Sequence, residues 1–428
     1  MTASWLPPAR PAWVERLIAH GEAVGGAENL VSLEAQELLA TARRSTGLDD
    51  FGGSEGAWQS HFERLLRALH EESDLHLAGR ILVRSELLRT LRNRLRLAAL
   101  WHERPALLDA PVPAPVFIVG AARSGTSILH ELLACDPATR TPAMWEMQHP
   151  VEAVTGSGDD RAEIADRTER FWADLQPEYE TMHQNSGRLP NECIFITLHE
   201  FLSDHWGGCH VVPGYEAHLA RADHVPAYRL HRRFLQTLQG KAGPQRWLLK
   251  APSHLSQLRA LFTVYPDAWI VRTHRDPAST LPSMIDLLGT LKWMRCARVD
   301  MTRAARVLPA AFEALFAREI EDRASGALPG ARFIDVHFRK LVADPAGTVA
   351  HIYDRLGWPF PAETRAAVAT YAARKPRGAR GAHRYSAEST GLDPADLRER
   401  FAFYREHYGI EEERSGTPVR PSGPRPSR

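Results

Sequence analysis

The sequence predicts an α/β fold in which a parallel sheet is flanked by helices. Four short apolar runs lie at 115–120, 246–250, 268–274 and 332–338, and uninterrupted runs of this length are typical of buried parallel strands. A helical pattern follows each of the first three runs, and strand–helix–strand order implies right-handed crossovers between parallel strands. A glycine-rich turn after the first run, residues 120–127, makes the predicted fold P-loop-like.

The first 110 residues are predicted to form a helical extension. Apolar residues recur there at spacings of three and four, and no strand alternation interrupts them. A proline-rich joint at 106–115 ends the helical pattern. The pattern is clearest in three segments, 30–45, 58–72 and 80–104.

Residues 111–410 are predicted to form the α/β domain. Within them, 151–245 contain no clear strand, so we expect a helical insertion lying over the C-terminal edge of the sheet. A last helix is expected to begin with Asp393 as its N-cap. The polar, proline-rich tail at 411–428 is predicted to be disordered. The apolar stripe of the last helix consists of Leu397, Phe401, Tyr404 and Tyr408.

Composition excludes several classes of function. The chain has 428 residues, 44% apolar and 25% charged, with 53 basic and 52 acidic side chains, so its net charge is +1. Bulk attraction to nucleic acid or to an anionic membrane is therefore not expected. No apolar run approaches the roughly 18 residues of a membrane span, and prolines interrupt the start where a secretory signal would be apolar. The scattered spacing of the cysteines predicts neither a disulfide framework nor a zinc site and favours a cytoplasmic location. The four cysteines are Cys135, Cys193, Cys209 and Cys296.

The glycine-rich turn GAARSGTS, residues 120–127, is the strongest local motif. Its spacing is that of a phosphate-binding loop, and the N–H groups and dipole of the following helix favour an anion. Thr126 stands where nucleotide triphosphatases have lysine, and Arg123 is the only cation in the loop. The loop therefore suits a phosphate with one further group better than a metal-chelated triphosphate.

The segment RSGTS resembles the loop of sulfotransferases that use 3′-phosphoadenosine 5′-phosphosulfate (PAPS), in particular a bacterial branch with R-[ST]-G-T-[ST]. This resemblance implies a P-loop-like α/β enzyme whose loop binds the 5′-phosphosulfate of PAPS. The residues that it assigns to donor binding are Arg123, Ser124, Gly125, Thr126 and Ser127.

A second motif, THRDPASTLPS, begins at Thr273. Arg275 lies just beyond the end of a predicted strand, where ligands bind in open α/β sheets. Asp276 is expected to cap the next helix, and Ser283 lies eight residues after Arg275. An arginine fork with a hydroxyl suits a phosphate monoester, and the resemblance implies that Arg275 and Ser283 hold the 3′-phosphate of PAPS.

The resemblance continues into 336–360, a stretch that is mainly structural in the family. A glycine-rich cationic segment follows, with no acid between Glu363 and Glu388. Such a segment suits a lid over an anionic ligand, although a solvated basic loop explains the same composition. Arg374 is followed by lysine and then proline instead of the family's R-K-G, whereas His383 and Tyr385 match the H-x-Y of the bacterial branch and are assigned to donor binding.

Sulfuryl transfer needs a base for the acceptor proton and a cation on the departing oxygen. Lys250, at the end of the second predicted strand, is the expected cation, with Arg123 assisting at the sulfuryl group. Glu192 and His254 are rival candidates for the base. No metal is expected. Three histidines are spaced too irregularly for a metal site, namely His199, His205 and His210.

The sequence thus predicts a PAPS-dependent sulfotransferase acting on a hydroxyl of a small-molecule, lipid or glycan acceptor. Residues 1–110 and 151–245 are expected to shape the acceptor pocket. Two alternatives remain open. One is a P-loop small-molecule kinase or other nucleotide-binding enzyme, which would require Mg²⁺ and ATP. The other is a non-catalytic protein that binds adenosine 3′,5′-bisphosphate.

Overall fold

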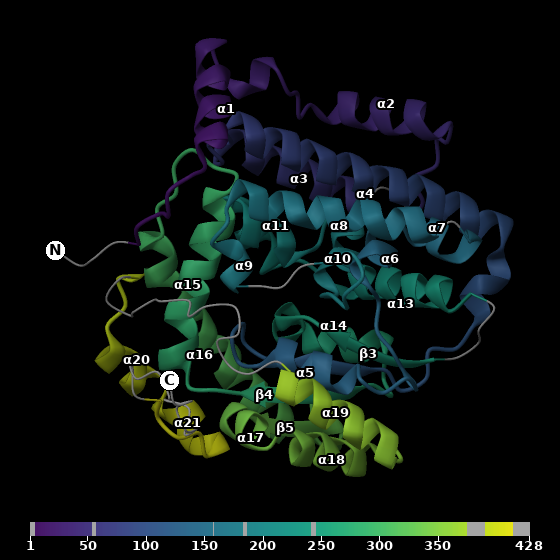
Figure 1. Cartoon of the computed structure of the whole chain (residues 1–428), viewed down its shortest axis with the longest axis vertical. Coiled ribbons are helices and arrows are strands. Elements are labelled where there is room, and N and C mark those ends of the chain that lie inside the picture. Colours follow the sequence, from purple (N-terminus) through teal and green to yellow (C-terminus); the bar gives the residue numbers. More distant parts are fainter. Residues whose placement is uncertain are drawn as a thin grey trace, which may run out of the picture.

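The structure is a computed structural model of the whole chain, shown in Figure 1. It describes residues 5–53, 57–156, 158–182, 186–240, 245–374 and 390–413.

A five-stranded parallel sheet lies at the centre of the fold, in the order β2-β3-β1-β4-β5. The four predicted strands and their parallel direction are confirmed. The edge strand β2 was not predicted, because a strand of two residues carries no sequence pattern. The bounds are β1 Val116–Val119, β2 Thr139–Arg140, β3 Arg246–Lys250, β4 Trp269–His274 and β5 Phe333–His337.

Both faces of the sheet are buried, which explains why its strands are apolar without alternation. All four residues of β1 have 0% exposure. Since successive side chains point to opposite faces, Val116 and Ile118 belong to one hydrophobic core and Phe117 and Val119 to another.

The helices that follow the strands cover these two faces. Helices α5, α18 and α19 pack on the Val116 side, at the bottom of Figure 1. The bounds are α5 Thr126–Leu133, α6 Met144–Gln148, η5 Pro252–Gln257, α14 Leu258–Val264, α15 Pro277–Trp293, α16 Thr302–Ala324, η6 Gly330–Arg332, α17 Phe338–Ala343, α18 Pro345–Leu356 and α19 Ala362–Arg374.

The N-terminal region is helical where the structure describes it and lies at the top of Figure 1. Most of its buried apolar residues share one hydrophobic core with the sheet, so the packing is continuous across residue 110, while Val14, Ala78 and Leu82 pack in a separate cluster. Helix α4 runs through this core, with its N-cap His76 accepting a hydrogen bond from the Gly79 N–H at 3.0 Å. The bounds are α1 Ala12–Ala23, η1 Ala27–Asn29, α2 Ala35–Thr46, α3 Ala57–Glu71, α4 Leu77–Glu103 and η2 Pro105–Asp109.

Among its described residues, the expected insertion at 151–245 forms helices joined by loops and has no strand, apart from an isolated β-bridge between Pro190 and Ala143. It reaches the C-terminal ends of the strands, because the N–H of Cys193 donates to the carbonyl of Lys250 at 2.8 Å. The bounds are α7 Pro150–Thr155, α8 Gly158–Leu175, α9 Tyr179–Met182, α10 Ile194–Thr197, η3 Leu198–Glu200, α11 Asp204–Cys209, α12 Pro213–Leu219 and α13 Val225–Gln239.

The last predicted helix is two helices, α20 Pro394–Arg400 and α21 Ala402–Tyr408, divided at Phe401. Asp393 is the N-cap, as predicted, and accepts from the N–H of Ala395 at 2.7 Å. Burial of Phe401 and Tyr404 against the core directs both helices onto the protein, so packing decides the break.

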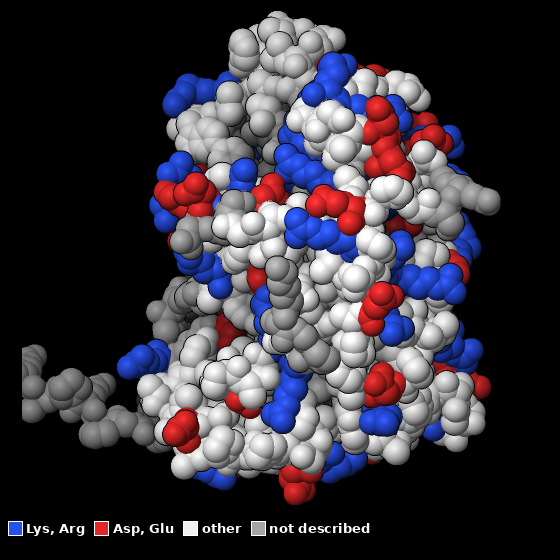
Figure 2. All heavy atoms as spheres, turned by 90° about the vertical axis from the view of Figure 1, so that its right-hand side faces the viewer, with Lys and Arg blue, Asp and Glu red and all other residues white. Residues whose placement is uncertain are grey.

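Positive and negative side chains are interspersed over the face shown in Figure 2, as the net charge of +1 leads one to expect. Among the described residues, no helix is long and apolar enough to cross a membrane.

Candidate active site

The predicted phosphate loop connects β1 to α5 through a tight turn. Gly125 is the N-cap of α5 with φ +95°, and Arg123 has φ +70°, conformations that favour glycine or need support from their surroundings. A Cβ on Gly120 would lie 2.1 Å from Thr273 Oγ1. The loop is therefore packed so closely against β4 that only glycine fits at its first position.

Two hydroxyls fix this loop from inside. Ser124 is buried, and its Oγ donates to the carbonyl of Ala121 at 2.6 Å and lies 2.7 Å from Thr273 Oγ1. The hydroxyl of Ser124 thus joins the loop to the neighbouring strand. Thr126 and Ser127 begin α5, where the first backbone N–H groups have no partner within the helix.

Lys250 and Glu192 form an ion pair beside the loop. Lys250 ends β3, next to β1, and its side chain is only 3% exposed. Its Nζ lies 2.6 Å from Glu192 Oε1 and 3.4 Å from Ser127 Oγ. The structure therefore brings together the predicted cation, one candidate base and the start of α5.

Arg275 and Ser283 lie on the same side of the sheet as the loop. Arg275 follows β4, and its Nη1 donates to the carbonyl of Arg123 at 2.8 Å. The Nε of Arg123 donates to Ser283 Oγ at 3.0 Å, and its Nη1 donates to the carbonyl of Met182 at 3.0 Å. Direct hydrogen bonds thus join the two predicted anion-binding elements, which are about 150 residues apart in the chain.

The helix after Arg275 begins as predicted. Asp276 is the N-cap of α15 and accepts from the N–H of Ala278 at 3.0 Å. The helix continues through Pro282, so Ser283 lies within its second turn and is buried. The guanidinium of Arg275 stacks over the ring of Phe338 at 4.1 Å, which holds it against the first helix after β5.

Comparisons with known proteins agree with this geometry. A family model described as "Sulfotransferase family" matches residues 115–362, which is more than half of the chain. The chain belongs to the sulfotransferase family. The resemblance inferred from the loop is therefore confirmed.

Solved sulfotransferases share the fold. The chain is 30% identical to sulfotransferase STF1 from Mycobacterium tuberculosis H37Rv, with a TM-score of 0.74 over 86% of this chain and 98% of that one. It is 26% identical to sulfotransferase STF9 from Mycobacterium avium, with a TM-score of 0.77 over 88% and 97%.

A curated relative, the omega-hydroxy-beta-dihydromenaquinone-9 sulfotransferase Stf3 of Mycobacterium bovis, is 24% identical over 271 residues. The match covers 57% of this chain and 62% of that protein. The chain thus spans less than two thirds of the length of the curated relative.

His254, the rival base, lies in a different environment from Glu192. Its ring is buried, with Nδ1 2.6 Å from the hydroxyl of Tyr228 and with Phe117 edge-on at 5.0 Å. Burial, helped by His231 and Lys250, lowers the pKa of His254 well below its usual value. The imidazole is therefore neutral and is packed between β1 and α13.

Some predicted residues lie outside the described part of the sulfotransferase chain. His383 and Tyr385 are among them, as is the rest of the cationic segment at 375–389 and the tail from residue 414. In the part that the structure describes, no group of three histidine, cysteine, aspartate or glutamate side chains is placed to hold a metal ion.

Sequence reasoning missed one residue at the site. Glu413 belongs to the expected disordered tail, yet its carboxylate contacts both Nε and Nη2 of Arg275 at 2.8 Å. A run of three glutamates, 411–413, was the only signal in the sequence. The partners of Glu413, Arg275 and Asp276, lie far away in the chain, so no local sequence pattern could identify this contact.

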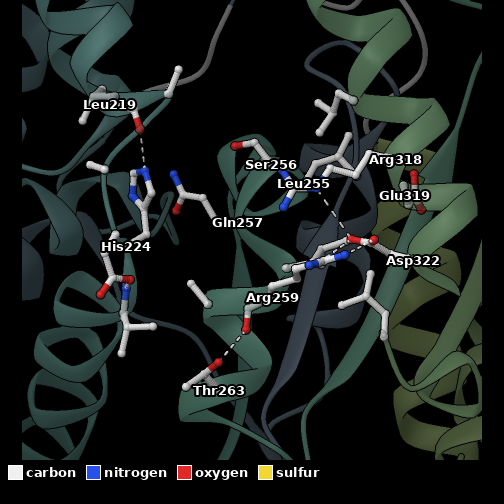
Figure 3. Close-up of a pocket in the computed structure, with 18 residues that line it drawn as sticks. Leu219, His224, Leu255, Ser256, Gln257, Arg259, Thr263, Arg318, Glu319 and Asp322 are labelled. Atoms are coloured by element: carbon white, nitrogen blue, oxygen red, sulfur yellow. Dashed lines mark hydrogen bonds and ion pairs between the residues drawn. The ribbon is translucent and has the colours of Figure 1, made fainter. Parts of the chain in front are cut away.

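A cavity of about 370 Å³ lies elsewhere, between α14, α16 and the segment joining α12 to α13 (Figure 3). Its polar groups largely pair with one another, since Arg259 Nε donates to Asp322 Oδ2 at 2.9 Å and His224 Nε2 donates to the carbonyl of Leu219 at 2.9 Å. None of the predicted donor or catalytic residues lines it. The candidate active site is therefore separate from this cavity and lies at the strand ends, where the predicted residues meet.

Proposed function

We propose that this protein transfers a sulfuryl group from PAPS to a hydroxyl of a small-molecule, lipid or glycan acceptor by in-line displacement. The observation that carries the proposal is Arg123. Its side chain reaches Ser283 while its carbonyl accepts from Arg275. The phosphate loop and the arginine–serine pair therefore lie within reach of one nucleotide.

The residues present fit the two phosphate-bearing ends of this donor. Glycine at 120 and 125 lets the loop pack tightly against Thr273 and Phe338. The start of α5 directs N–H groups and a partial positive charge toward an anion bound by this loop. Arg275 offers a planar fork suited to a phosphate monoester, and Ser283 offers a hydroxyl. The donor supplies the activated sulfuryl group, and these residues bind and orient the donor through its negatively charged ends.

Lys250 and Glu192 are proposed to act on the reaction itself. Lys250 lies beside Ser127 at the start of α5, where it neutralises charge on the oxygen that departs with the 5′-phosphate. Glu192 is the proposed general base, because it lies beside Lys250 and its side chain is 16% exposed, whereas the ring of His254 is buried between β1 and α13. Arg123 is proposed to assist at the sulfuryl group.

The acceptor is proposed to bind between the insertion and the strand ends. Met182 and Phe195 lie beside the polar residues Arg123 and Glu192. The carbonyl of Met182 accepts from Arg123, and Phe195 lies on α10, three residues after Glu192. Both side chains are largely buried and apolar. The name of the Stf3 relative specifies a hydroxylated menaquinone, which supports an alcohol with an apolar body as the acceptor.

A cytoplasmic location is part of the proposal. All four cysteines are free thiols in the structure, three of them buried. Free cysteines suit a reducing compartment such as the cytoplasm.

Calorimetric titration tests the donor site. We expect adenosine 3′,5′-bisphosphate to bind the parent protein more tightly than AMP does, and ATP with Mg²⁺ to bind no better than AMP. Arg275→Ala should remove most of the advantage of the bisphosphate, roughly tenfold or more for a lost charge-assisted fork. Arg298→Ala is the matched control, because Arg298 is exposed and pairs only with Asp74 among the contacts described.

Two outcomes would contradict the proposal. Equal affinity for AMP and the bisphosphate in the parent protein would remove the assignment of the 3′-phosphate. Tighter binding of ATP with Mg²⁺ would favour a kinase. Transfer of radiolabelled sulfate from PAPS into a lipid or cell extract then separates an enzyme from a protein that only binds the nucleotide.

A further inference from the structure

The guanidinium proposed to hold the 3′-phosphate already has an anionic partner from the same chain. Both Nε and Nη2 of Arg275 donate to the carboxylate of Glu413 at 2.8 Å. The backbone N–H of Glu413 donates to Asp276 Oδ2 at 2.9 Å, which fixes the chain next to the arginine. With Nη1 bound to the carbonyl of Arg123, the side-on fork of Arg275 is directed at Glu413.

The buried contacts of α21 hold this segment in place. It follows α21, whose Tyr404 is buried and lies 3.3 Å from Arg272 Nη2 and 2.8 Å from His274 Nδ1. The segment therefore begins on an element that is fixed to β4, the strand that ends just before Arg275. Each of the other two glutamates also meets an arginine, in the pairs Glu411–Arg339 and Glu412–Arg405.

A carboxylate and a phosphate oppose each other at one arginine fork. Both bind a guanidinium through two parallel N–H···O bonds, so the same edge of Arg275 cannot hold both at once. Two anions left in contact would also repel each other in a partly buried site. The side chains of Arg275 and Glu413 are 16% and 19% exposed, so water can reach the pair when it separates.

We propose that Glu413 competes with the 3′-phosphate for the fork of Arg275. The carboxylate of Glu413 leaves Arg275 when the donor binds and returns when the bisphosphate product departs. The inference rests on the proposed assignment of Arg275 to the 3′-phosphate. Glu413 is only five residues beyond the end of α21, and this short connection keeps its carboxylate at a high effective concentration near the fork of Arg275. Glu413 thereby weakens the binding of both the donor and the product.

Weaker product binding affects turnover. The 3′-phosphate is common to PAPS and to adenosine 3′,5′-bisphosphate, so every catalytic cycle must break the contact of Arg275 with this group. A carboxylate ready to take its place speeds this exchange, because Arg275 is not left unpaired as the product leaves. Nucleotides without a 3′-phosphate do not require Glu413 to move.

The test compares Glu413→Gln with Glu412→Gln in the full-length protein. Glu413→Gln keeps the size of the side chain and the backbone bond to Asp276 but removes the charge. We expect its Kd for adenosine 3′,5′-bisphosphate to fall roughly threefold to fivefold, the upper part of the range for losing a partly exposed ion pair that competes with the ligand. Its Kd for AMP should stay within about twofold. Glu412→Gln should leave both constants unchanged, because Glu412 pairs with Arg405.

Shortening the chain after Ile410 provides a second variant, which should tighten bisphosphate binding in the same way. The double variant Arg275→Ala/Glu413→Gln should bind the bisphosphate as Arg275→Ala does, since the competitor acts only through that arginine. Unchanged or weaker bisphosphate binding by Glu413→Gln would overturn the inference while leaving the donor site intact. If Arg275→Ala itself does not affect bisphosphate binding, the proposed donor site fails instead.

Discussion

Replacing Lys250 with methionine tests the proposed chemistry most directly. Methionine keeps the length of an apolar stem but removes the ammonium group that lies 2.6 Å from Glu192 and 3.4 Å from Ser127. The structure implies two separable losses. One is stability, because Glu192 loses its partner in a largely buried pair, a cost of about 1–3 kcal/mol. The other is stabilisation of the transition state.

The loss in rate should exceed the loss in binding. A preorganised donor aimed at developing charge contributes about 10²–10³ in kcat, or about 2.7–4 kcal/mol. We therefore expect Lys250→Met to lower kcat for sulfate transfer by this factor while the Kd for adenosine 3′,5′-bisphosphate changes by less than about threefold. The assay follows release of the bisphosphate from PAPS in the presence of an accepting extract, beside calorimetry on the same preparation.

Glu192→Gln is the companion variant. It removes the proposed base, for which a loss of about 10²–10⁴ is expected, but leaves an amide oxygen for Lys250. Because the two groups touch, the double variant should lose less than the sum of the two single effects.

A Lys250→Met protein that folds and keeps kcat within about threefold of the parent would refute the role assigned to the lysine.

Two further predictions concern stability. Glu319→Gln should lower the free energy of unfolding, measured with denaturant, by about 3–5 kcal/mol. It leaves the guanidinium of Arg272 without its charged partner at a site where both side chains are 0% exposed. Glu313→Gln, at an exposed position, is the control, and an equal effect of the two variants would contradict the prediction. Burial lowers the pKa of His231, which lies beside the hydroxyl of Tyr265, to about 3. The unfolded chain binds a proton near pH 6.5 and the folded one does not, so Tm should fall as the pH drops from about 6.5 toward 4, and His231→Gln should reduce that dependence.

Much of the fold follows from local sequence. The four predicted strands are short apolar runs because both faces of the sheet are buried, and that burial leaves a pattern in the sequence. The phosphate loop is also a local feature, since glycine at 120 and 125 is required by a close contact and a left-handed turn within a few residues. Asp276 and Asp393 cap their helices through their own next turn and could be predicted for the same reason.

The chemistry of the site depends on contacts that no local pattern records. The sequence left Glu192 and His254 as rival candidates for the base. Folding places Glu192 against Lys250, 58 residues away in the chain, and buries the ring of His254 between β1 and α13. The difference is one of burial and partner, which depend on how the insertion packs on β3.

The same reason explains the end of the chain. Polar, proline-rich composition predicted disorder from residue 411, because such a segment cannot bury enough apolar surface to offset its ordering. Charge pairing orders the first three residues instead, and one of these pairs joins Glu413 to Arg275 across 138 residues. Composition determined that this segment would build no core. Only the folded sheet, by presenting an arginine fork beside the last helix, decided where its carboxylate binds.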